Sequence, residues 1–321
     1  MSIKVNKIRK LSDYFIESLQ DGILRSFLSL VKQDPTLCLQ IRADYINIYY
    51  RGGNLVRISQ EGRGFIPSFD SNYCKGLAIK LPVSQPLATD QDVNEWIYAV
   101  PLLKQAMDYW FGQHSKDERE YQQLVWRENN GSTVGGGTDY FIIDIEYDNH
   151  IGARLDMVAV RWDSNGICRK FPERFKPVLT FVEMKYGDGA LSGKAGMEKH
   201  IEDLKRYISK QGLEGIKKEM LEVFKQQRLC GLIPALKNNL NPISIFADEV
   251  DYLFILANHD PDSRKLYDIL NNVNKAYGES DLGFKVKFCV SNFMGYGIYK
   301  QNVYSLDELM SRFDRQILCK L

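Results

Sequence analysis

Three short apolar segments that each carry charged residues constrain this chain most. They read YFIIDIEYD (140–148), RLDMVAVRW (154–162) and VLTFVEMKY (178–186). Each is rich in β-branched and aromatic residues, and turn-forming residues separate them, which predicts three successive strands. Because they are almost continuously apolar, we expect them to be buried. A charged side chain there costs free energy unless it is paired or binds a metal, so these charged residues are the first candidates for function.

The second and third segments deliver two carboxylates and an amine. Asp156 lies 27 residues before Glu183, and Lys185 follows two residues later. Strand side chains alternate, so Glu183 and Lys185 share one face. Carboxylate oxygens are ligands that Mg²⁺ and Mn²⁺ prefer, and the backbone carbonyl of Met184 is a further candidate ligand. A lysine beside a metal and a phosphate can orient or deprotonate water, or stabilise developing charge. The pattern predicts a divalent-cation site acting on phosphodiesters.

A helix predicted just before these strands offers a third carboxylate. The segment KDEREYQQLVWREN follows Ser115, a candidate N-cap. Its apolar face is expected to contain Tyr121, Leu124 and Val125. At 100° per residue, Glu118 falls about 65° from the centre of that face and Glu120 about 95°. We therefore prefer Glu118 as the additional ligand; the alternative is a surface carboxylate paired with neighbouring basic residues.

Other titratable residues have simpler interpretations. Asp144 and Glu146 alternate on the first predicted strand and could approach the site, but side chains that face solvent are the simpler account. His114, His150 and His259 show no partner pattern, so we expect them to be structural or exposed. The chain also lacks a Ser-His-Asp set, a phosphate-binding glycine loop and a zinc site with paired Cys and His.

The order of elements predicts a mixed α/β (α+β) fold that is divided into two domains. Residues 1–90 contain two predicted helices and three strands (37–41, 45–50 and 55–58), forming an N-terminal α+β block of unknown role. Its aromatic strand YINIYY is either core packing, which we favour, or a nucleic-acid platform. Residues 91–321 contain a helix that Pro101 is expected to kink or divide, then helix, three strands, helices, and further strands at 251–257 and 284–290. That order predicts a mixed sheet flanked by helices.

At RLDMVAV and VLTFVEMKYG the sequence resembles the D…ExK signature of the PD-(D/E)XK nuclease superfamily. The resemblance covers residues 116–207, under a third of the chain, and it implies a restriction-endonuclease-like α-β-β-β-α-β core. The helix DEREYQQLV is similar to the first helix of archaeal Holliday-junction resolvases, which again favours Glu118. The family's helix after the ExK strand often carries Gln, Lys or His near the site, and His200 fits that place. An ordinary helix histidine is the alternative for His200.

Two departures from the family pattern accompany the resemblance. Leu155 stands where proline often precedes the aspartate, at a position that varies within the superfamily. The loop between the second and third strands, about fifteen residues, is longer than in minimal members. Residues 1–90 match no family pattern.

The resemblance implies a Mg²⁺- or Mn²⁺-dependent deoxyribonuclease acting on duplex or branched DNA, with a role in repair, restriction or defence. A homodimer is implied by the resemblance alone. One alternative is a non-catalytic nucleic-acid-binding or scaffold protein that retains the fold; another is an enzyme acting on RNA or a different phosphodiester. The near balance of 42 basic and 41 acidic residues gives no global basic field.

Sequence features also predict where the protein resides. The polar opening MSIKVNKIRK has no signal-peptide pattern, and no apolar run is long enough to span a bilayer. The six cysteines are scattered without a CxxC pair, which favours reduced thiols. We therefore expect a cytoplasmic protein without membrane contact.

Overall fold

Two compact units make up the chain, which is known here as a computed structural model. It describes residues 8–131, 138–148, 154–193, 196–234, 236, 242–259, 264–278, 280–291, 298 and 300–318. The first unit comprises Met1–Thr133 with Glu219–Asn238, and the second comprises Val134–Lys218 with Asn239–Leu321. The units therefore separate near residue 133, and not at residue 90, so the helices between residues 90 and 131 belong with the N-terminal block. Both units mix helices and strands, which confirms the expected α+β class.

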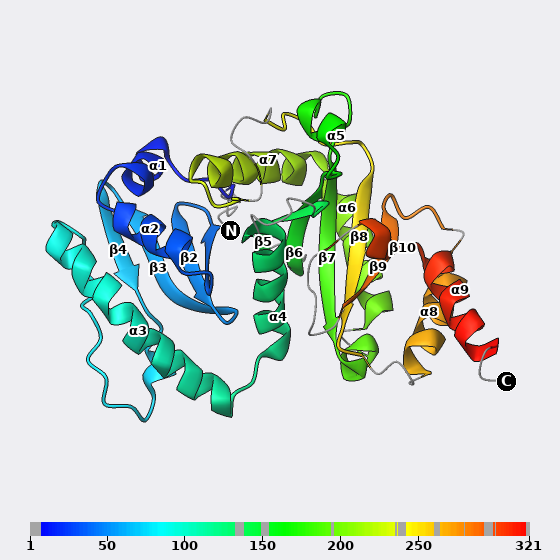
Figure 1. Ribbon diagram of the computed structural model, residues 1–321, viewed down its shortest axis with the longest axis horizontal. Helices are drawn as coiled ribbons and strands as arrows, with labels where there is room; N and C mark the ends of the chain where they lie inside the picture. Colours follow the sequence, from blue (N-terminus) through cyan, green and yellow to red (C-terminus); the bar gives the residue numbers. More distant parts are fainter. Residues whose placement is uncertain are drawn as a thin grey trace. The chain divides into compact units, whose positions relative to one another are not determined.

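The first unit is built on a four-stranded antiparallel sheet in the order β1-β2-β3-β4 (Figure 1). Its strands are β1 (Leu37–Ile41), β2 (Tyr45–Tyr50), β3 (Gly53–Glu61) and β4 (Gly64–Ser68). Its helices are α1 (Asp13–Gln20), α2 (Arg25–Gln33), η1 (Ser71–Cys74), α3 (Asp90–Gln113), α4 (Asp117–Trp126) and the π-helical η2 (Arg127–Gly131). Inner residues of the YINIYY strand are buried, so they contribute to the core.

Helix α3 runs through Pro101 without being divided. Thr89 caps it, and the Asp92 carboxylate accepts from the backbone N–H of Thr89 in a capping box. The side chains that it buries recur at helical spacing: Val93, Trp96, Val100, Leu103, Ala106, Met107 and Phe111. We attribute the continuity of α3 to this packing, which offsets the hydrogen bond that proline cannot make.

The second unit contains a six-stranded mixed sheet in the order β10-β9-β8-β7-β6-β5 (Figure 1). Its strands are β5 (Tyr140–Asp148), β6 (Arg154–Arg161), β7 (Val178–Tyr186), β8 (Val250–Ala257), β9 (Lys285–Ser291) and β10 (Val303–Tyr304). Strands β5, β6 and β7 are antiparallel neighbours, whereas β8 and β9 run parallel to β7. Residues 251–257 therefore form a strand, as expected, and this strand lies beside β7.

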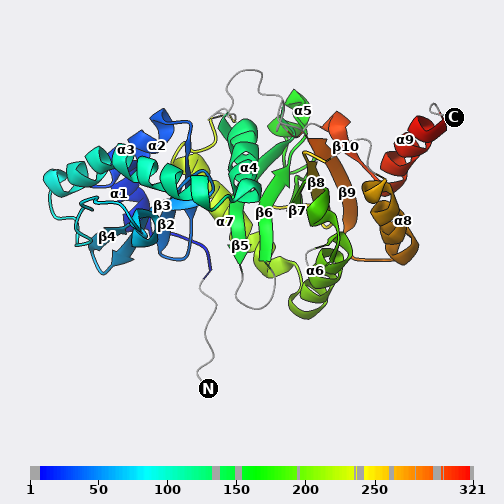
Figure 2. The same ribbon diagram turned by 90° about the horizontal axis from the view of Figure 1, so that it is seen from below.

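Helices accompany this sheet (Figure 2). They are α5 (Gly166–Lys170), η3 (Asp188–Leu191), α6 (Met197–Gln211), α8 (Lys265–Tyr277), η5 (Lys300–Asn302) and α9 (Leu306–Leu318). Helix α7 (Glu214–Leu229) begins in the second unit and continues in the first. Gly187 follows β7 at φ 67°, a conformation that favours glycine, and so allows the chain to turn towards α6. Within the described ranges, no helix is both long and apolar enough to cross a membrane.

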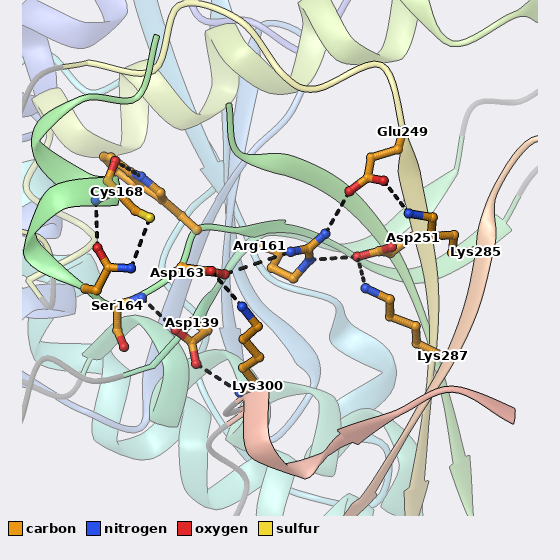
Figure 3. Close-up of polar contacts among 12 residues, drawn as sticks. Asp139, Arg161, Asp163, Ser164, Cys168, Glu249, Asp251, Lys285, Lys287 and Lys300 are labelled. Carbon is orange, nitrogen blue, oxygen red and sulfur yellow. Dashed lines mark hydrogen bonds and ion pairs between the residues drawn. The ribbon is translucent and has the colours of Figure 1, made fainter. Parts of the chain in front are cut away.

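A charged cluster joins β6, β8 and β9 at the ends of these strands (Figure 3). The Asp251 carboxylate is fully buried, and its Oδ2 accepts from Arg161 Nε at 2.8 Å and Lys287 Nζ at 2.9 Å. Arg161 also contacts Glu249, which pairs with Lys285. Positive and negative groups pair with one another here, as buried charges must, so we assign this cluster to sheet stability.

Candidate functional site

Asp156 is fixed where the pairing of β6 with β7 ends. The last backbone pair of that ladder is Met157 with Val182, so the next position sets Asp156 opposite Glu183. The Asp156 Oδ2 atom accepts from the backbone N–H of Met184 at 2.8 Å. The N–H and C=O of one residue leave a strand on the same side, so the Met184 carbonyl also faces the Asp156 strand. The two predicted carboxylates therefore lie on neighbouring strands and one face.

Glu183 and Lys185 form a buried ion pair on β7. Lys185 Nζ donates to Glu183 Oε1 at 2.7 Å, and both side chains are almost fully buried, at 3% and 4% exposure. The side chains meet because residues two apart on a strand share a face. A charge buried this deeply is stabilised only if it is paired and hydrogen-bonded. The apolar strand therefore holds a carboxylate and an ammonium in fixed positions.

His200 approaches the same carboxylate from α6. Its Nε2 lies 3.1 Å from Glu183 Oε1, and its side chain is 23% exposed. Helix α6 buries Met197, Ile201 and Leu204, which recur at the i, i+4, i+7 spacing of one helix face. His200 stands at the border of that face. The structure thus brings four of the predicted site residues together in the second unit, from β6, β7 and α6.

Tyr252 is a buried polar residue that the sequence did not single out. It pairs with Phe181 while Phe254 pairs with Glu183, so it lies on the face of β7 that carries Glu183. The Tyr252 hydroxyl has no hydrogen-bond partner among the residues that the structure describes. Burial raises its pKa well above the ordinary tyrosine value, and the nearby carboxylates of Glu183 and Asp156 add to the rise.

Glu118 lies on α4, in the first unit, and is half-buried. The alternative, Glu120, forms two hydrogen bonds of 3.0 Å with the Arg51 guanidinium of the same unit. Glu120 is therefore occupied in an ion pair within the first unit. The role of Glu118 as an additional ligand to a divalent cation stays a prediction.

The buried face of α4 differs from the expected one. Gln122, Gln123, Val125 and Trp126 are buried, whereas Tyr121 and Leu124 are only half-buried. Gln123 is buried because its amide forms hydrogen bonds with the backbone of Gly52 and Thr36. Polarity alone therefore predicted the burial of Val125 but missed the buried Gln122, Gln123 and Trp126. Ser115 is also not the N-cap: the helix begins after Lys116, and the Ser115 hydroxyl donates to Asp117.

Asp144 is fully buried, contrary to the expectation that it faces solvent. The register of β5 sets it opposite Val158, two residues from Asp156 on the same face of β6. A shift of register after Ile142 brings it there, and such a bulge leaves no clear sequence signal. Glu146 is half-buried, with a left-handed φ of 53°. Asp144 is thus a further carboxylate near the site, which is the alternative that the sequence allowed but did not favour.

The remaining histidines show no shared arrangement. His114 is exposed and stacks on Trp110, and His259 is half-buried after β8. His150 lies outside the described residues. In the described part of the chain, no group of three or more His, Cys, Asp or Glu side chains is arranged to hold a metal ion.

No protein-family model matches this sequence, and neither a curated protein nor a solved structure matches the chain. The functional assignment therefore depends on the arrangement of the residues described above.

Proposed function

We propose that the protein is a Mg²⁺- or Mn²⁺-dependent nuclease of the PD-(D/E)XK type that hydrolyses phosphodiester bonds in DNA. The observation that carries this proposal is the meeting of Asp156, Glu183 and Lys185 on one face of β6 and β7. The carboxylates are fixed by the Met184 N–H and by the Lys185 ammonium. A site whose side chains are already oriented has little reorganisation left to undergo when substrate binds.

The chain order of elements supports the same family. A helix (α4), three antiparallel strands (β5, β6 and β7), a helix (α6) and a strand parallel to β7 (β8) occur in this order. The short helices α5 and η3 flank β7, and α7 precedes β8. This is the α-β-β-β-α-β order that the resemblance implies. The D and ExK residues lie on β6 and β7, the strands to which the signature assigns them.

The residues present fit a hard divalent cation. Mg²⁺ is commonly bound by one or two carboxylates, with water and phosphate oxygens completing its coordination. Asp156 and Glu183 would supply those carboxylates and Met184 a carbonyl. The buried Tyr252 hydroxyl, which lacks a partner among the described residues, also fits a site that binds ordered water. When bound, the cation would stabilise charge on the phosphate and lower the pKa of a coordinated water.

The protein's own groups have separable roles in this proposal. Lys185 lies 2.7 Å from Glu183 and is the only ammonium that the predicted site set contains, so it is the group to orient water or neutralise charge on the phosphate. His200 holds Glu183 from the α6 side and is suited to positioning that carboxylate. The backbone N–H of Met184 donates to the Asp156 Oδ2 atom. This hydrogen bond orients the Asp156 carboxylate before substrate binds.

The proposal is tested by incubating the protein with plasmid, linear duplex, single-stranded and branched DNA in Mn²⁺ or EDTA. Asp156→Asn is the informative variant, because its amide oxygen still accepts from Met184 while the negative charge is lost. We expect cleavage that requires Mn²⁺ and falls at least about 100-fold in Asp156→Asn and in Lys185→Ala. Lys205→Ala, an exposed lysine on α6, is the matched control and should retain activity.

Cleavage that persists in both site variants would contradict the assignment of the site. No cleavage of any substrate, together with no Mn²⁺ binding by calorimetry, would favour the scaffold alternative. Cleavage of RNA but not DNA would retain the site and change the substrate.

A further inference from the structure

A cavity of about 470 Å³ lies in the first unit between η1 and the C-terminal end of α3. Its volume is within the range of roughly 300–1,000 Å³ that is typical of small-molecule pockets. Aromatic, amide and ammonium groups line it together, among them Asn72, Tyr73, Lys75, Tyr109, Trp110 and Gln113. None of these residues belongs to the candidate metal site.

The aromatic wall of the cavity is held in place from behind. Tyr73 and Trp110 meet edge to face with ring centroids 5.2 Å apart, and His114 stacks on Trp110 at 4.5 Å. Gly53 on β3 leaves room for this arrangement, because a Cβ there would lie only 2.8 Å from the Tyr73 hydroxyl and from the Phe111 ring. The rings are therefore ordered before any ligand binds.

These rings are accessible, unlike most of the protein's aromatic core. Trp110 is half-buried, whereas Trp96, Trp126 and Trp162 are all buried, and Tyr109 is 51% exposed. Exposed aromatic faces beside a cation are the combination by which proteins bind single-stranded nucleic acids, stacking on the bases and neutralising the backbone. Because the Tyr109 ring is exposed, packing within the unit does not explain its presence.

Polar groups at the cavity complete the match to a nucleotide. The exposed Lys75 supplies a positive charge for a phosphate. The side-chain amides of Asn72 and Gln113 offer both donors and acceptors, which base edges require. Asp70, also at the cavity, uses its Oδ1 atom to accept from the backbone and side-chain amides of Asn72, at 2.9 and 2.8 Å.

From these features we propose that the cavity binds a nucleobase of single-stranded nucleic acid, stacked against Tyr109 and Trp110 with an adjacent phosphate at Lys75. The choice of nucleic acid over another aromatic-binding partner rests on the proposed nuclease function. A proline-rich peptide is the competing occupant, since such peptides also dock on aromatic grooves.

Binding of a fluorescein-labelled single-stranded oligonucleotide, followed by anisotropy in EDTA, tests this directly. Tyr109→Ala is expected to weaken binding at least fivefold, about the low end of the effect of losing one stacked base. Lys75→Ala is expected to weaken it and to reduce its salt dependence. Tyr98→Ala is the matched control: Tyr98 is 79% exposed on the same helix but does not line the cavity, so binding should be unchanged.

Tryptophan fluorescence gives a second readout that folding defects do not mimic. Since the other three tryptophans are buried, quenching by an unlabelled oligonucleotide should come from Trp110 and should be lost in Trp110→Phe. Equal quenching in Trp110→Phe, or equal affinity in Tyr109→Ala and Tyr98→Ala, would overturn the proposal. The proposal would also be overturned if a proline-rich peptide bound the wild type and lost affinity in Tyr109→Ala, while the affinity for oligonucleotides did not change in that variant.

Cleavage is measured separately from this binding. Oligonucleotide binding that depends on Tyr109, in a protein that cuts no substrate, supports the pocket and contradicts the nuclease. If cleavage depends on Mn²⁺ but oligonucleotide binding is unchanged in Tyr109→Ala, the proposed nucleobase pocket is contradicted and the proposed nuclease function is not.

Discussion

Glu183 is held by two basic side chains inside an apolar strand. Lys185 lies 2.7 Å and His200 3.1 Å from the same carboxylate oxygen. The pair is almost fully buried, so the attraction between the charges must offset the cost of removing them from water. A buried ion pair often stabilises a fold no more than apolar side chains of similar volume would. The pair is therefore better explained by a chemical role, as proposed above, than by stability.

Removing Lys185 should therefore destabilise the protein as well as inactivate it. Lys185→Ala leaves the Glu183 charge without its ammonium, and we expect a loss of about 3–5 kcal/mol in the free energy of unfolding. The double variant Glu183→Leu/Lys185→Met removes both charges and should recover most of that stability without recovering cleavage. Urea denaturation of the three proteins measures this. A double variant no more stable than Lys185→Ala would show that the buried charges themselves stabilise the fold.

The Tyr252 hydroxyl gives a second prediction at this scale. A buried hydroxyl that makes no hydrogen bond costs about 1–3 kcal/mol, so Tyr252→Phe should stabilise the metal-free protein by about 1 kcal/mol. If the hydroxyl is satisfied only when a hydrated cation is bound, the same variant should weaken Mn²⁺ binding. Thermal unfolding in EDTA and Mn²⁺ calorimetry measure the two effects. A lower stability of Tyr252→Phe in EDTA would mean that the hydroxyl already has a stabilising partner.

At the scale of elements, the buried side-chain amide of Gln123 helps to attach α4 to the rest of the first unit. Gln123 accepts from the Gly52 N–H at 2.7 Å and donates to the carbonyl oxygens of Thr36 and Tyr49. Gln123 therefore connects the helix to the β2–β3 turn and to the chain before β1. The position of Glu118, on the same helix, depends on this attachment.

Gln123→Ala should lower the free energy of unfolding by about 1–3 kcal/mol, because it leaves a buried N–H and a buried carbonyl without their partner. Gln105→Ala, at an exposed position on α3, is the control and should change stability by less than about 0.5 kcal/mol. Chemical denaturation distinguishes the two. Equal effects of both substitutions would show that the Gln123 amide is replaced by water at little cost.

Elements with a continuous apolar pattern were predictable from the sequence, and those set by tertiary contacts were not. Strands β6, β7 and β8 follow from runs such as VLTFVEMKY, and their charged residues led to Asp156, Glu183 and Lys185. Short elements such as α5 and β10 contain too few residues to show the hydrophobic periodicity of a helix or a strand. The buried amide of Gln123 and the bulge that buries Asp144 depend on partners far away in sequence.

At the scale of the whole molecule, the chain divides into a unit that contains the candidate metal site and a unit that contains the aromatic cavity. The second unit supplies Asp156, Glu183, Lys185 and His200. The first contains α4 and the rings at Tyr73 and Trp110. The sequence predicted a boundary near residue 90, where the strands of the N-terminal block end and a long helical pattern begins. The packing of α3 on β3 places that helix in the first unit instead.

The central claim is that Asp156 and Glu183 bind one divalent cation. Anomalous diffraction from crystals grown with Mn²⁺ tests it most directly, since Mn²⁺ scatters anomalously and the protein's carbon, nitrogen and oxygen do not. We predict a peak within about 2–2.5 Å of a carboxylate oxygen of each residue in the wild type. No peak should appear at this position in Asp156→Asn. A peak that persists in Asp156→Asn, or no peak at this position in the wild type, would contradict the account.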